Sequence, residues 1–399
     1  MQHVVVLGGG VGGTLAANLI ARKIKKQIAA GEARVTVVDE TGNHAYQPGY
    51  MYIAMGQERA EKLVRPERKL LDDNVDLVVD TIERIDAAAQ SVLLSSGKQL
   101  QYGQLVIATG SRIMPQEIEH FDTEAHHFYT AEASARLRKA LDAFTGGKIV
   151  IGIAGIPYKC PPAPLEVAFL IESELRERGL RDKTELTFLS PINRAFTIES
   201  VSDMATPIFE EKGIRLELLA GVSEIDAERK VVITDAFEEH PYDLLICVPP
   251  HKGAQAVIDS GLAPKSGWLP TDRNTLQVKT VAKPAPGRAD GDIPRFANIF
   301  ALGDTTDLPL SKAGSTAHFE APIVAERVAA AVLGRKPSGK HKSYTGKVMC
   351  FFEVGDGKGT LLQFDYEHPP KPPKPNQLWH LGKIVFNKTY WHTVPRGRI

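Results

Sequence analysis

The sequence is poor in cysteine, with three residues in a chain of 399. So few cysteines exclude a disulfide framework, and any bond between two of them is expected to serve catalysis rather than stability. The chain also lacks a net charge, because 48 basic residues balance 48 acidic ones. Without a basic excess, we expect no nucleic acid among its partners. We also predict no metal site.

Long apolar runs are missing as well. No stretch has the roughly 20 consecutive apolar residues that a membrane-spanning helix needs. Met1 leads directly into a strand pattern, without the successive regions of a signal peptide. We therefore expect a chain kept in the cytoplasm, which leaves attachment to the membrane surface open. What is present is an ordinary globular composition over a length that suggests two domains and a smaller third region.

Residues 3–40 have the pattern of a strand, a glycine-rich turn, a helix and a second strand. Gly8, Gly10 and Gly13 supply the spacing G-x-G-x-x-G, which permits a tight turn and lets a pyrophosphate approach the helix N-terminus. Asp39 ends the second strand, where a carboxylate can bind ribose hydroxyls. The glycine spacing alone is weak, but this order of elements predicts a dinucleotide site.

Two later segments also run from a strand into a turn. One strand pattern leads into Ala108-Thr109-Gly110, and another ends in Gly303-Asp304 before a helix pattern over 315–331. With the first turn, these motifs resemble the FAD-binding signature of the flavoproteins with two dinucleotide-binding domains. The resemblance implies FAD as the cofactor, a hydrogen bond between Asp304 and the ribityl chain, and a helix N-terminus directed at the isoalloxazine ring.

The fold class that follows is α/β, with two Rossmann-like domains, the second inserted in the first. We assign residues 1–115 and 286–335 to a discontinuous FAD-binding domain, and 116–285 to the second domain. Residues 336–399 form a small C-terminal region. A proline- and glycine-rich stretch over 282–297 is predicted to be the return linker.

The second domain begins like the first and then departs from it. Its first strand leads into Gly152-Ile-Ala-Gly155-Ile-Pro157, which lacks the third glycine of the motif. Its next strand ends at residues 188–191 without an acidic residue. Relatives that use NADH have both features in this domain, so we predict that the turn does not bind a nicotinamide nucleotide.

Cys160 follows this turn, between Lys159 and Pro161-Pro162. Proline suits the first turn of a helix, and an amphipathic pattern over 165–178 follows, so Cys160 is predicted close to a helix N-terminus. A helix N-terminus and a neighbouring lysine both lower the pKa of a thiol. We therefore predict a reactive cysteine, the alternative being a buried inert thiol.

The surroundings of two cysteines carry a narrower resemblance. Cys160-Pro-Pro-Ala-Pro followed by Glu166, together with Cys350 and its aromatic neighbours, resembles the sulfide:quinone oxidoreductases and the related flavocytochrome c sulfide dehydrogenases. The likeness covers nearly the whole chain. It implies that Cys160 and Cys350 form a disulfide–persulfide centre that oxidises sulfide, with electrons passing through FAD to a membrane quinone. Glu166 becomes a candidate proton shuttle, the equal alternative being a solvated carboxylate on a helix face.

The same resemblance suggests residues for the quinone. Lys312 is predicted to contact the flavin or the quinone headgroup. Phe351 and Phe352 are candidates for an aromatic face against the quinone ring. Since side chains alternate along a strand, one of the two phenylalanines is expected in the core.

One position departs from the family pattern. Many quinone-linked members have a further cysteine in a His-x-x-Cys-Thr context, where this chain has Tyr129. Cys247 ends an apolar strand and is predicted to be a core thiol rather than a substitute. The missing cysteine keeps open a non-enzymatic flavin-bound persulfide carrier or redox sensor. A type II NADH:quinone dehydrogenase-like enzyme is the other alternative, disfavoured by the broken second turn.

The last part of the chain has an aromatic-rich amphipathic pattern over 377–391, after a proline-rich spacer at 369–375. Leu378, Leu381 and Val385 fall on one side at helical spacing. We predict that the tail attaches the protein to the surface of the cell membrane as a peripheral protein. A helix docked on its own core or on a partner in a homo-oligomer is the alternative. The aromatic and basic residues expected at the membrane interface are Trp379, Tyr390, Trp391, Lys383, Lys388 and Arg396.

Overall fold

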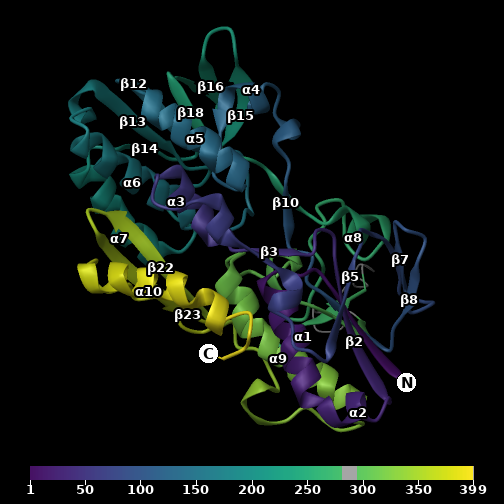
Figure 1. Cartoon of the computed structure of the whole chain (residues 1–399). Coiled ribbons are helices and arrows are strands. Elements are labelled where there is room, and N and C mark those ends of the chain that lie inside the picture. The colour runs from purple at the N-terminus through teal and green to yellow at the C-terminus, as the bar shows by residue number, and fades with distance from the viewer. Residues whose placement is uncertain (281–293, 399) are drawn as a thin grey trace, which may run out of the picture.

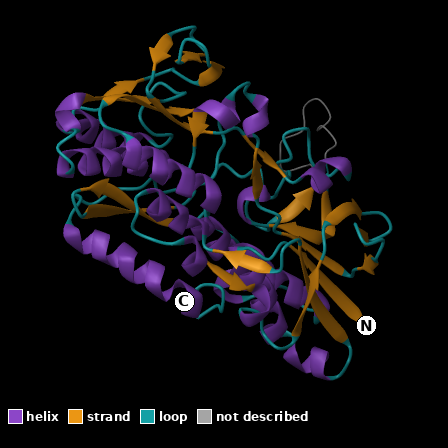
Figure 2. Ribbon diagram, turned by 45° about the horizontal axis from the view of Figure 1, so that its top comes forward, coloured by secondary structure: helices purple, strands orange, loops and turns teal. Residues whose placement is uncertain are grey.

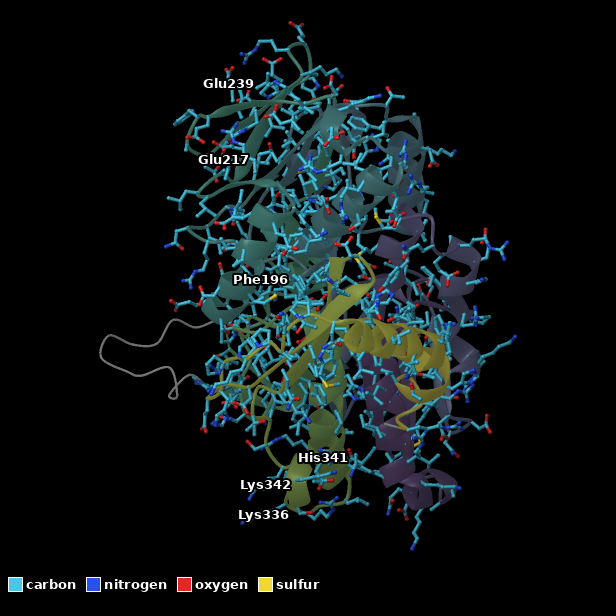
Figure 3. The ribbon with its side chains drawn as sticks, turned by 90° about the vertical axis from the view of Figure 1, so that its left-hand side faces the viewer. Phe196, Glu217, Glu239, Lys336, His341 and Lys342 are labelled. Atoms are coloured by element: carbon cyan, nitrogen blue, oxygen red, sulfur yellow. The ribbon has the colours of Figure 1, made fainter. Side chains whose placement is uncertain are left out.

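The computed structural model describes residues 1–280 and 294–398. Two sheet-centred domains lie end to end, and the C-terminal elements run along one side of the molecule (Figures 1 and 2). This arrangement confirms the α/β class with two Rossmann-like domains. Figure 3 marks the long axis: Glu217 and Glu239 lie at the end formed by the second domain, and Lys336 and Lys342 lie at the opposite end.

The first domain is built on a six-stranded sheet in the order β20-β21-β9-β1-β2-β5. Its strands are parallel except for the pair β20 and β21. In β1, Val4 to Leu7 are all fully buried, as expected for a parallel strand that is covered on both faces. The strands span Gln2–Leu7 (β1), Ala33–Asp39 (β2), Val75–Val79 (β5), Gln104–Ile107 (β9), Gln277–Lys279 (β20) and Arg295–Ala301 (β21).

Helices α1 (Val11–Lys23) and α9 (Gly314–Val332) pack side by side on one face of this sheet (Figure 1). Buried alanines on both helices, such as Ala17 and Ala325, join one apolar cluster with the sheet. The other face packs against a small antiparallel sheet and α8, where Val92 and Val257 are buried. These elements span Ile82–Asp86 (β6), Ser91–Leu94 (β7), Gln99–Gln101 (β8) and Gln255–Asp259 (α8), while Lys25–Ala29 (α2) extends α1.

The second domain is built on a five-stranded parallel sheet in the order β11-β18-β12-β13-β14. Alternate residues of β12 serve two cores: Ile149 and Ile151 face the cluster that includes the helices, and Val150 faces the cluster under a second small sheet. The parallel strands span Ala125–His126 (β11), Gly147–Ile153 (β12), Thr184–Leu189 (β13), Arg215–Glu217 (β14) and Leu244–Val248 (β18). The covering elements are Val222–Asp226 (β15), Val231–Thr234 (β16), Glu239–Pro241 (β17), Phe121–Glu124 (α4), Ala131–Ala143 (α5), Ala163–Glu177 (α6) and Glu199–Glu211 (α7).

The chain passes between the domains through an antiparallel ribbon of β10 (Ser111–Ile113) and β19 (His251–Gly253). The return differs from the predicted boundary at 285, because β20 pairs with β21 in the first sheet. Val257 and Val278 are likewise buried in the first domain. The predicted boundary lies too late in the chain because it was placed at the proline-rich stretch 282–297. Residues 282–293 of this stretch lie outside the described part of the structure.

The C-terminal region packs along the two domains instead of standing away from them. β22 (Val348–Gly355) and β23 (Lys358–Phe364) form a hairpin, whose turn has φ of 54° at Asp356 and 64° at Gly357. Such positive values suit a tight hairpin turn. α10 (Gln377–Thr393) lies against this hairpin, with Asn376 capping its N-terminus. The proline-rich segment therefore does not act as the spacer that the sequence predicted.

Helix α3 (Tyr50–Ala54) belongs to the first domain by sequence but packs against α5, with Met51 and Ala54 in the second domain's apolar cluster. The strands β3 (Asn43–Ala45) and β4 (Val64–Pro66) frame it as an antiparallel pair. Among the described residues, no helix is long and apolar enough to cross a bilayer. The same residues hold no cluster of His, Cys, Asp and Glu suited to a metal ion.

Candidate active site

The glycine turn after β1 is tight at its ends and open in its middle. Gly8 has a φ of 102°, and a Cβ there would lie 2.4 Å from the carbonyl oxygen of Ala108. A Cβ on Gly13 would lie 1.9 Å from the carbonyl oxygen of Gly8, so both positions require glycine. Around a Cβ on Gly10, by contrast, no described atom lies within 4 Å. The open part faces the N-terminus of α1, where free N–H groups favour an anion.

Asp39 lies at the edge of this turn, where the sequence predicted it. Its Oδ2 accepts a hydrogen bond from the Gly9 N–H at 2.9 Å. Its Oδ1 accepts from the N–H groups of Thr41 and Gly42 at 3.0 and 2.7 Å. These bonds fix the carboxylate at the end of β2, the position in which a dinucleotide fold binds ribose hydroxyls.

The two later motifs meet because their strands are neighbours. Ile107 pairs with Ala301, so the turns that follow β9 and β21 emerge at the same edge of the sheet. The hydroxyl oxygens of Thr109 and Thr305 lie 3.2 Å apart across them. Gly110 has a φ of 65°, and no described atom lies within 4 Å of a Cβ placed there. Backbone of both motifs thus borders open space beside the first turn.

Asp304 and Lys312 form the charged part of this edge. Burial raises the pKa of Asp304, while the positive charges of Lys159 and Lys312 act against that rise. Lys312 Nζ donates to the carbonyl oxygens of Thr306 at 2.6 Å and Asp304 at 3.1 Å. It also lies 4.0 Å from the centre of the Trp268 ring, so the ammonium group is held in place rather than free in solvent.

The chain therefore has the features that FAD requires. The glycine cradle and Asp39 suit the adenosine and pyrophosphate parts. The Ala108–Gly110 and Gly303–Asp304 segments border the next part of the same opening. α9 begins there, at Gly314, and none of the described side chains caps its N-terminus. A helix end of this kind stabilises negative charge on a bound group.

Cys160 lies at this edge in a left-handed backbone conformation, with a φ of 55°. Its N–H donates to the carbonyl oxygen of Lys312 at 2.6 Å, and its carbonyl accepts from the Ala163 N–H at 2.9 Å. The predicted lowering of its pKa is wrong. Burial raises the pKa of the Cys160 thiol, and the charge of Glu166 adds to the rise. The charge of Lys383 and the hydrogen bond with the Ala163 backbone oppose this rise.

Cys350 reaches the same segment from β22. Its Sγ lies 3.2 Å from the Ser315 hydroxyl, three residues after the Lys312 carbonyl that binds Cys160. Burial also raises the pKa of Cys350. All three cysteines lie in the described part of the chain and are free thiols. The start of α9 thus brings together two cysteines that are far apart in the sequence.

Glu166 is not a solvated carboxylate. It is 3% exposed, and its Oε1 accepts from Lys383 Nζ at 2.6 Å and from the Glu353 N–H at 2.7 Å. Lys383, 8% exposed, is therefore an internal ion-pair partner, not the membrane-interface anchor that the sequence predicted. Burial raises the pKa of Glu166, and the Lys383 charge opposes this rise.

The structure adds residues that sequence reasoning missed. Glu353 is buried on β22 and binds His380 Nδ1 through both carboxylate oxygens, at 3.1 and 2.9 Å. The Tyr52 hydroxyl donates to Glu353 Oε1 at 3.2 Å. The spacing of His380 and Lys383 on one helix face was the only sequence signal available for this group. No linear motif joins it to α3 or β22.

Other predicted residues separate into core and edge. Phe352 is fully buried against Phe169 and cannot provide a face for a ligand. Phe351 is half-buried beside Phe386, with ring centres 6.1 Å apart. Cys247 is fully buried, which confirms the predicted core thiol. Tyr129 is also buried, and its hydroxyl finds no hydrogen-bond partner within the described residues.

The tail helix docks at its C-terminal end as well. Tyr390 is buried, and its hydroxyl lies 2.7 Å from His44 Nε2. Tyr390 is therefore part of the core near β3, which corrects its assignment to a membrane interface. Leu378, Leu381 and Val385 remain more than half exposed on the opposite side of α10.

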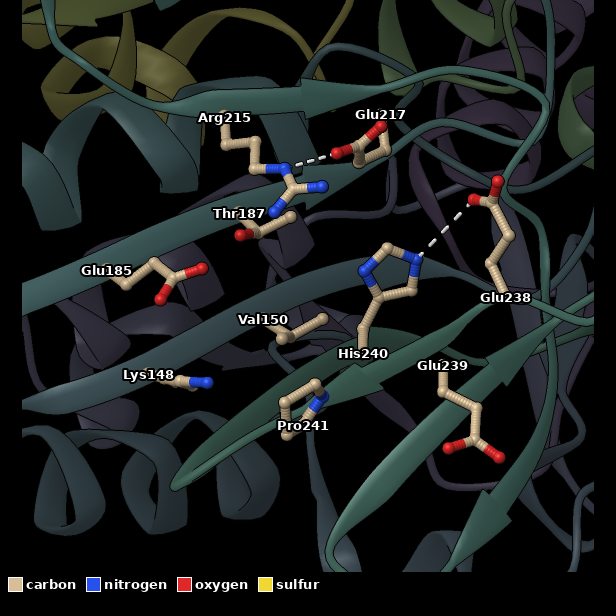
Figure 4. Close-up of a pocket in the computed structure, with 10 residues that line it drawn as sticks. All are labelled: Lys148, Val150, Glu185, Thr187, Arg215, Glu217, Glu238, Glu239, His240 and Pro241. Atoms are coloured by element: carbon tan, nitrogen blue, oxygen red, sulfur yellow. Dashed lines mark hydrogen bonds and ion pairs between the residues drawn. The ribbon is translucent and has the colours of Figure 1, made fainter.

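A cavity of about 360 Å³ lies on the second domain, between its parallel sheet and β17 (Figure 4). Arg215 pairs with Glu217 there, and His240 lies 3.8 Å from Glu238. None of the residues that line it belongs to the cysteine or glycine motifs. We therefore place the candidate active site at the start of α9, not in this cavity.

Comparisons with known proteins agree with this geometry. Residues 2–156 match the family model of the pyridine nucleotide-disulphide oxidoreductases. The mitochondrial sulfide:quinone oxidoreductase of Mus musculus is 24% identical, covering 99% of this chain and 86% of its own length. The sulfide-quinone reductase of Aquifex aeolicus is 25% identical, covering 100% and 92%. The crystal structure of the Aquifex aeolicus sulfide:quinone oxidoreductase superposes with a TM-score of 0.81 at 22% identity, over 100% of this chain and 92% of the other.

The fold, the glycine cradle and the two later turns define an FAD-binding flavoprotein oxidoreductase with two dinucleotide-binding-type domains. Within that class, the chain is similar over nearly its full length to several sulfide:quinone oxidoreductases.

Proposed function

We propose that the protein oxidises sulfide at a centre formed by Cys160 and Cys350 and passes the electrons through FAD to a quinone. The observation that carries the proposal is the convergence of both cysteines on residues 312–315, at the start of α9 beside Asp304. The names of the relatives point to the same substrates. When bound, FAD supplies a two-electron acceptor.

The cysteine chemistry balances as follows. Hydrosulfide attacks the Cys160 sulfur of a Cys160–Cys350 bridge, a new sulfur–sulfur bond forms, and the old bond leaves its electron pair on Cys350 as a thiolate. The Cys160 persulfide then loses its proton. Loss of two electrons joins the persulfide and the Cys350 thiolate into a trisulfide bridge. Burial raises the pKa of both thiols, which favours the uncharged bridged forms between turnovers.

Glu166 is the proton acceptor in this proposal. Its carboxylate is close enough to both cysteines to raise the pKa of each thiol through its charge. Burial raises its own pKa toward the working range of a general base. Protonated Glu166 no longer repels the thiolate that forms on Cys350, so proton transfer and bond cleavage assist each other.

The quinone is proposed to approach Phe351 and Lys312. Phe351 keeps a partly exposed face, unlike Phe352, and Lys312 is positioned beside the Asp304 backbone. We also propose that the exposed apolar residues Leu378, Leu381 and Val385 of α10 contact the membrane that holds the quinone. Replacing all three by serine should release the protein from lipid vesicles without loss of bound FAD. Equal vesicle binding by the variant and the wild type would rule out this contact.

Anaerobic flavin spectroscopy tests the function directly. Sulfide should bleach the flavin absorbance of the purified protein, and reoxidation by a short-chain quinone should restore it. NADH, added separately, should have little effect, because the turn at 152–157 lacks the third glycine and β13 ends without an acid. Rapid bleaching by NADH with no response to sulfide would overturn the proposal.

A further inference from the structure

A group of polar side chains extends from Glu166 to the outer surface. Glu166 comes from α6, Lys383 and His380 from α10, Glu353 from β22 and Tyr52 from α3. Lys383 and His380 are three residues apart, so they share the helix face that is turned toward β22. The exposed apolar residues of α10 occupy its other side.

The contacts form a chain with one end beside the cysteines and the other at solvent. Lys383 Nζ binds Glu166 at 2.6 Å and lies 5.5 Å from the centre of the Tyr52 ring, and its positive charge opposes the rise that burial causes in the pKa of Tyr52. The Tyr52 hydroxyl donates to Glu353 at 3.2 Å. Glu353 contacts His380 at 2.9 Å, and the His380 side chain is 28% exposed whereas that of Glu353 is 1% exposed.

The charges of the group do not cancel without a mobile proton. Two buried carboxylates, on Glu166 and Glu353, face one ammonium group, on Lys383. A single added proton makes the group neutral, and it can reside at the inner end on Glu166 or at the outer end on His380. Burying an unbalanced charge is costly, so the group favours holding one proton and handing on any second one.

We propose that Lys383, Tyr52, Glu353 and His380 form a proton path from Glu166 beside the cysteine pair to solvent at α10. The inference rests on the proposed function, since it carries the proton that the Cys160 persulfide releases. Glu166 takes that proton. Lys383, an ammonium group without an acceptor, first gives one of its own protons to the Tyr52 hydroxyl and then takes the proton from Glu166. Tyr52 passes a proton to Glu353, and Glu353 passes it to His380 and water. Each group ends the cycle as it began.

Other ionisable groups face this path and share its pH dependence. Cys160 and Cys350 lie at the inner end, and the charges of Glu166 and Lys383 act on both. Tyr46 interacts with Tyr52, Lys383 and Glu166. Burial raises the pKa of Tyr46 and of Tyr52 above the usual range, so both phenols stay protonated and only Tyr52 has a carboxylate to donate to.

The test uses thiol reactivity in the FAD-loaded protein, with the cysteines reduced. Dithiodipyridine reacts with thiolates and releases a chromophore, so its rate reports how readily the buried thiols lose protons. In dilute buffer, His380→Ala should slow this reaction by about tenfold. This is less than the roughly 100-fold or larger rate effect of a group that transfers a proton directly to or from the reacting atom. Added imidazole, a small mobile base, should restore the rate. Tyr52→Phe keeps the ring and removes the hydroxyl, so it should slow the reaction with dithiodipyridine, and imidazole should not restore the rate. The solvent isotope effect on this rate should become larger.

The matched control is His392→Ala, an exposed histidine on the same helix, which should react at the wild-type rate. FAD content and the melting temperature are measured for every variant. A wild-type rate in His380→Ala would overturn the path, as would a slowed rate that imidazole fails to restore. Because the assay contains no sulfide, this outcome is separate from the proposed function. If sulfide fails to bleach the flavin while imidazole restores the thiol reaction rate of His380→Ala, the proton path is supported and the proposed function is overturned.

Discussion

Each domain contains a unit of strand, turn, helix and parallel strand, β1-α1-β2 in the first and β12-α6-β13 in the second, and the two units differ at the turn. The turn after β1 keeps its glycines, needs them at Gly8 and Gly13, and ends beside the carboxylate of Asp39. The turn after β12 has open space around Gly155 and continues into Cys160 and its prolines. The turn after β1 lets a phosphate group approach the backbone closely. The turn after β12 leaves room for Cys160, which reaches the start of α9.

The difference teaches how a binding fold can become part of a redox site. In a dinucleotide fold the ligand lies at the carboxyl edge of the sheet, and the second domain keeps that edge while replacing the ligand by a side chain. The first site is completed within its own domain. The second depends on distant elements, since Lys312 holds Cys160, and Lys383 of α10 neutralises Glu166.

The sharpest test of the comparison exchanges a single methyl group in each turn. Gly13→Ala should abolish FAD binding, because the added Cβ would lie 1.9 Å from the carbonyl oxygen of Gly8. Gly155→Ala, the matched change in the second turn, should keep FAD, because no described atom lies within 4 Å of the new Cβ. The flavin-to-protein absorbance ratio of the purified variants measures the outcome. Full FAD loading of Gly13→Ala would mean that the first turn is not the cradle.

The cysteines test what replaced the second nucleotide site. Cys160→Ser and Cys350→Ser should each keep FAD but lose sulfide-dependent bleaching by more than about 1,000-fold, as when a nucleophile is removed. Cys247→Ala serves as the control, since this thiol is buried in the apolar cluster under the second domain's small sheet. Stopped-flow absorbance gives the rates. Normal bleaching in Cys350→Ser would show that the two cysteines do not act together.

The dependence of the second site on the tail predicts a loss of stability. Lys383→Met leaves Glu166 buried without its partner, which should cost about 3–5 kcal/mol in the free energy of unfolding. The double variant Glu166→Gln, Lys383→Met should recover most of that loss, since neither charge remains. Denaturant unfolding of both variants measures the difference. Equal stability of the Lys383→Met variant and the wild type would mean that the pair is not a structural link.

The same contacts change the expectation for truncation. If the tail attached the protein to the membrane, as the sequence predicts, removing residues 377–399 would release the protein into the soluble fraction and leave sulfide-to-flavin transfer intact. In the structure this deletion removes Lys383 from Glu166 and Tyr390 from His44, so a loss of stability is expected first. Exposed residues of α10 are therefore the better target for separating membrane contact from folding.

The elements that the sequence predicted well are those with a local cause. The glycine turn, the strand ends at Asp39 and Asp304, and the helix after Lys312 each follow from residues that are close in the chain. The fold class followed from the alternation of these elements. The return boundary at 285 failed because the chain has already rejoined the first domain at Val257, and the edge strand Gln277–Lys279 has little pattern of its own.

The parts of the site that could not be predicted depend on tertiary contacts. The proline-rich turn suggests a low pKa for Cys160, but burial, which no local pattern reports, raises it. Lys383 reads as a basic residue of an amphipathic tail until Glu166, 217 positions earlier, is found beside it. A lysine on the polar side of a helix looks the same in sequence whether it faces water or a buried carboxylate.

The smallest expected effect concerns how the first domain holds its two helices together. Glu326 of α9 binds Lys23 of α1 at 2.8 Å and Arg335 at 2.7 Å. The hydrogen bond from Arg335 is the main cause that lowers the pKa of Glu326 from 4.5 to about 2. A carboxyl group whose pKa is lowered in the folded state stabilises it above its ordinary pKa, and this contribution is lost as the pH falls through the folded value.

Glu326→Gln should therefore lower the free energy of unfolding by about 1.5–3 kcal/mol at neutral pH, the usual range for hydrogen bonds to charged groups. The difference in the free energy of unfolding between Glu326→Gln and the wild type should become smaller as the pH falls from 4.5 toward 2. Denaturant unfolding at a series of pH values, followed by release of FAD, measures this in the domain that holds the cofactor. A difference in the free energy of unfolding that stays constant across that pH range would show that Glu326 acts through packing. The ion pairs between α1 and α9 would then add nothing to the stability of the glycine cradle.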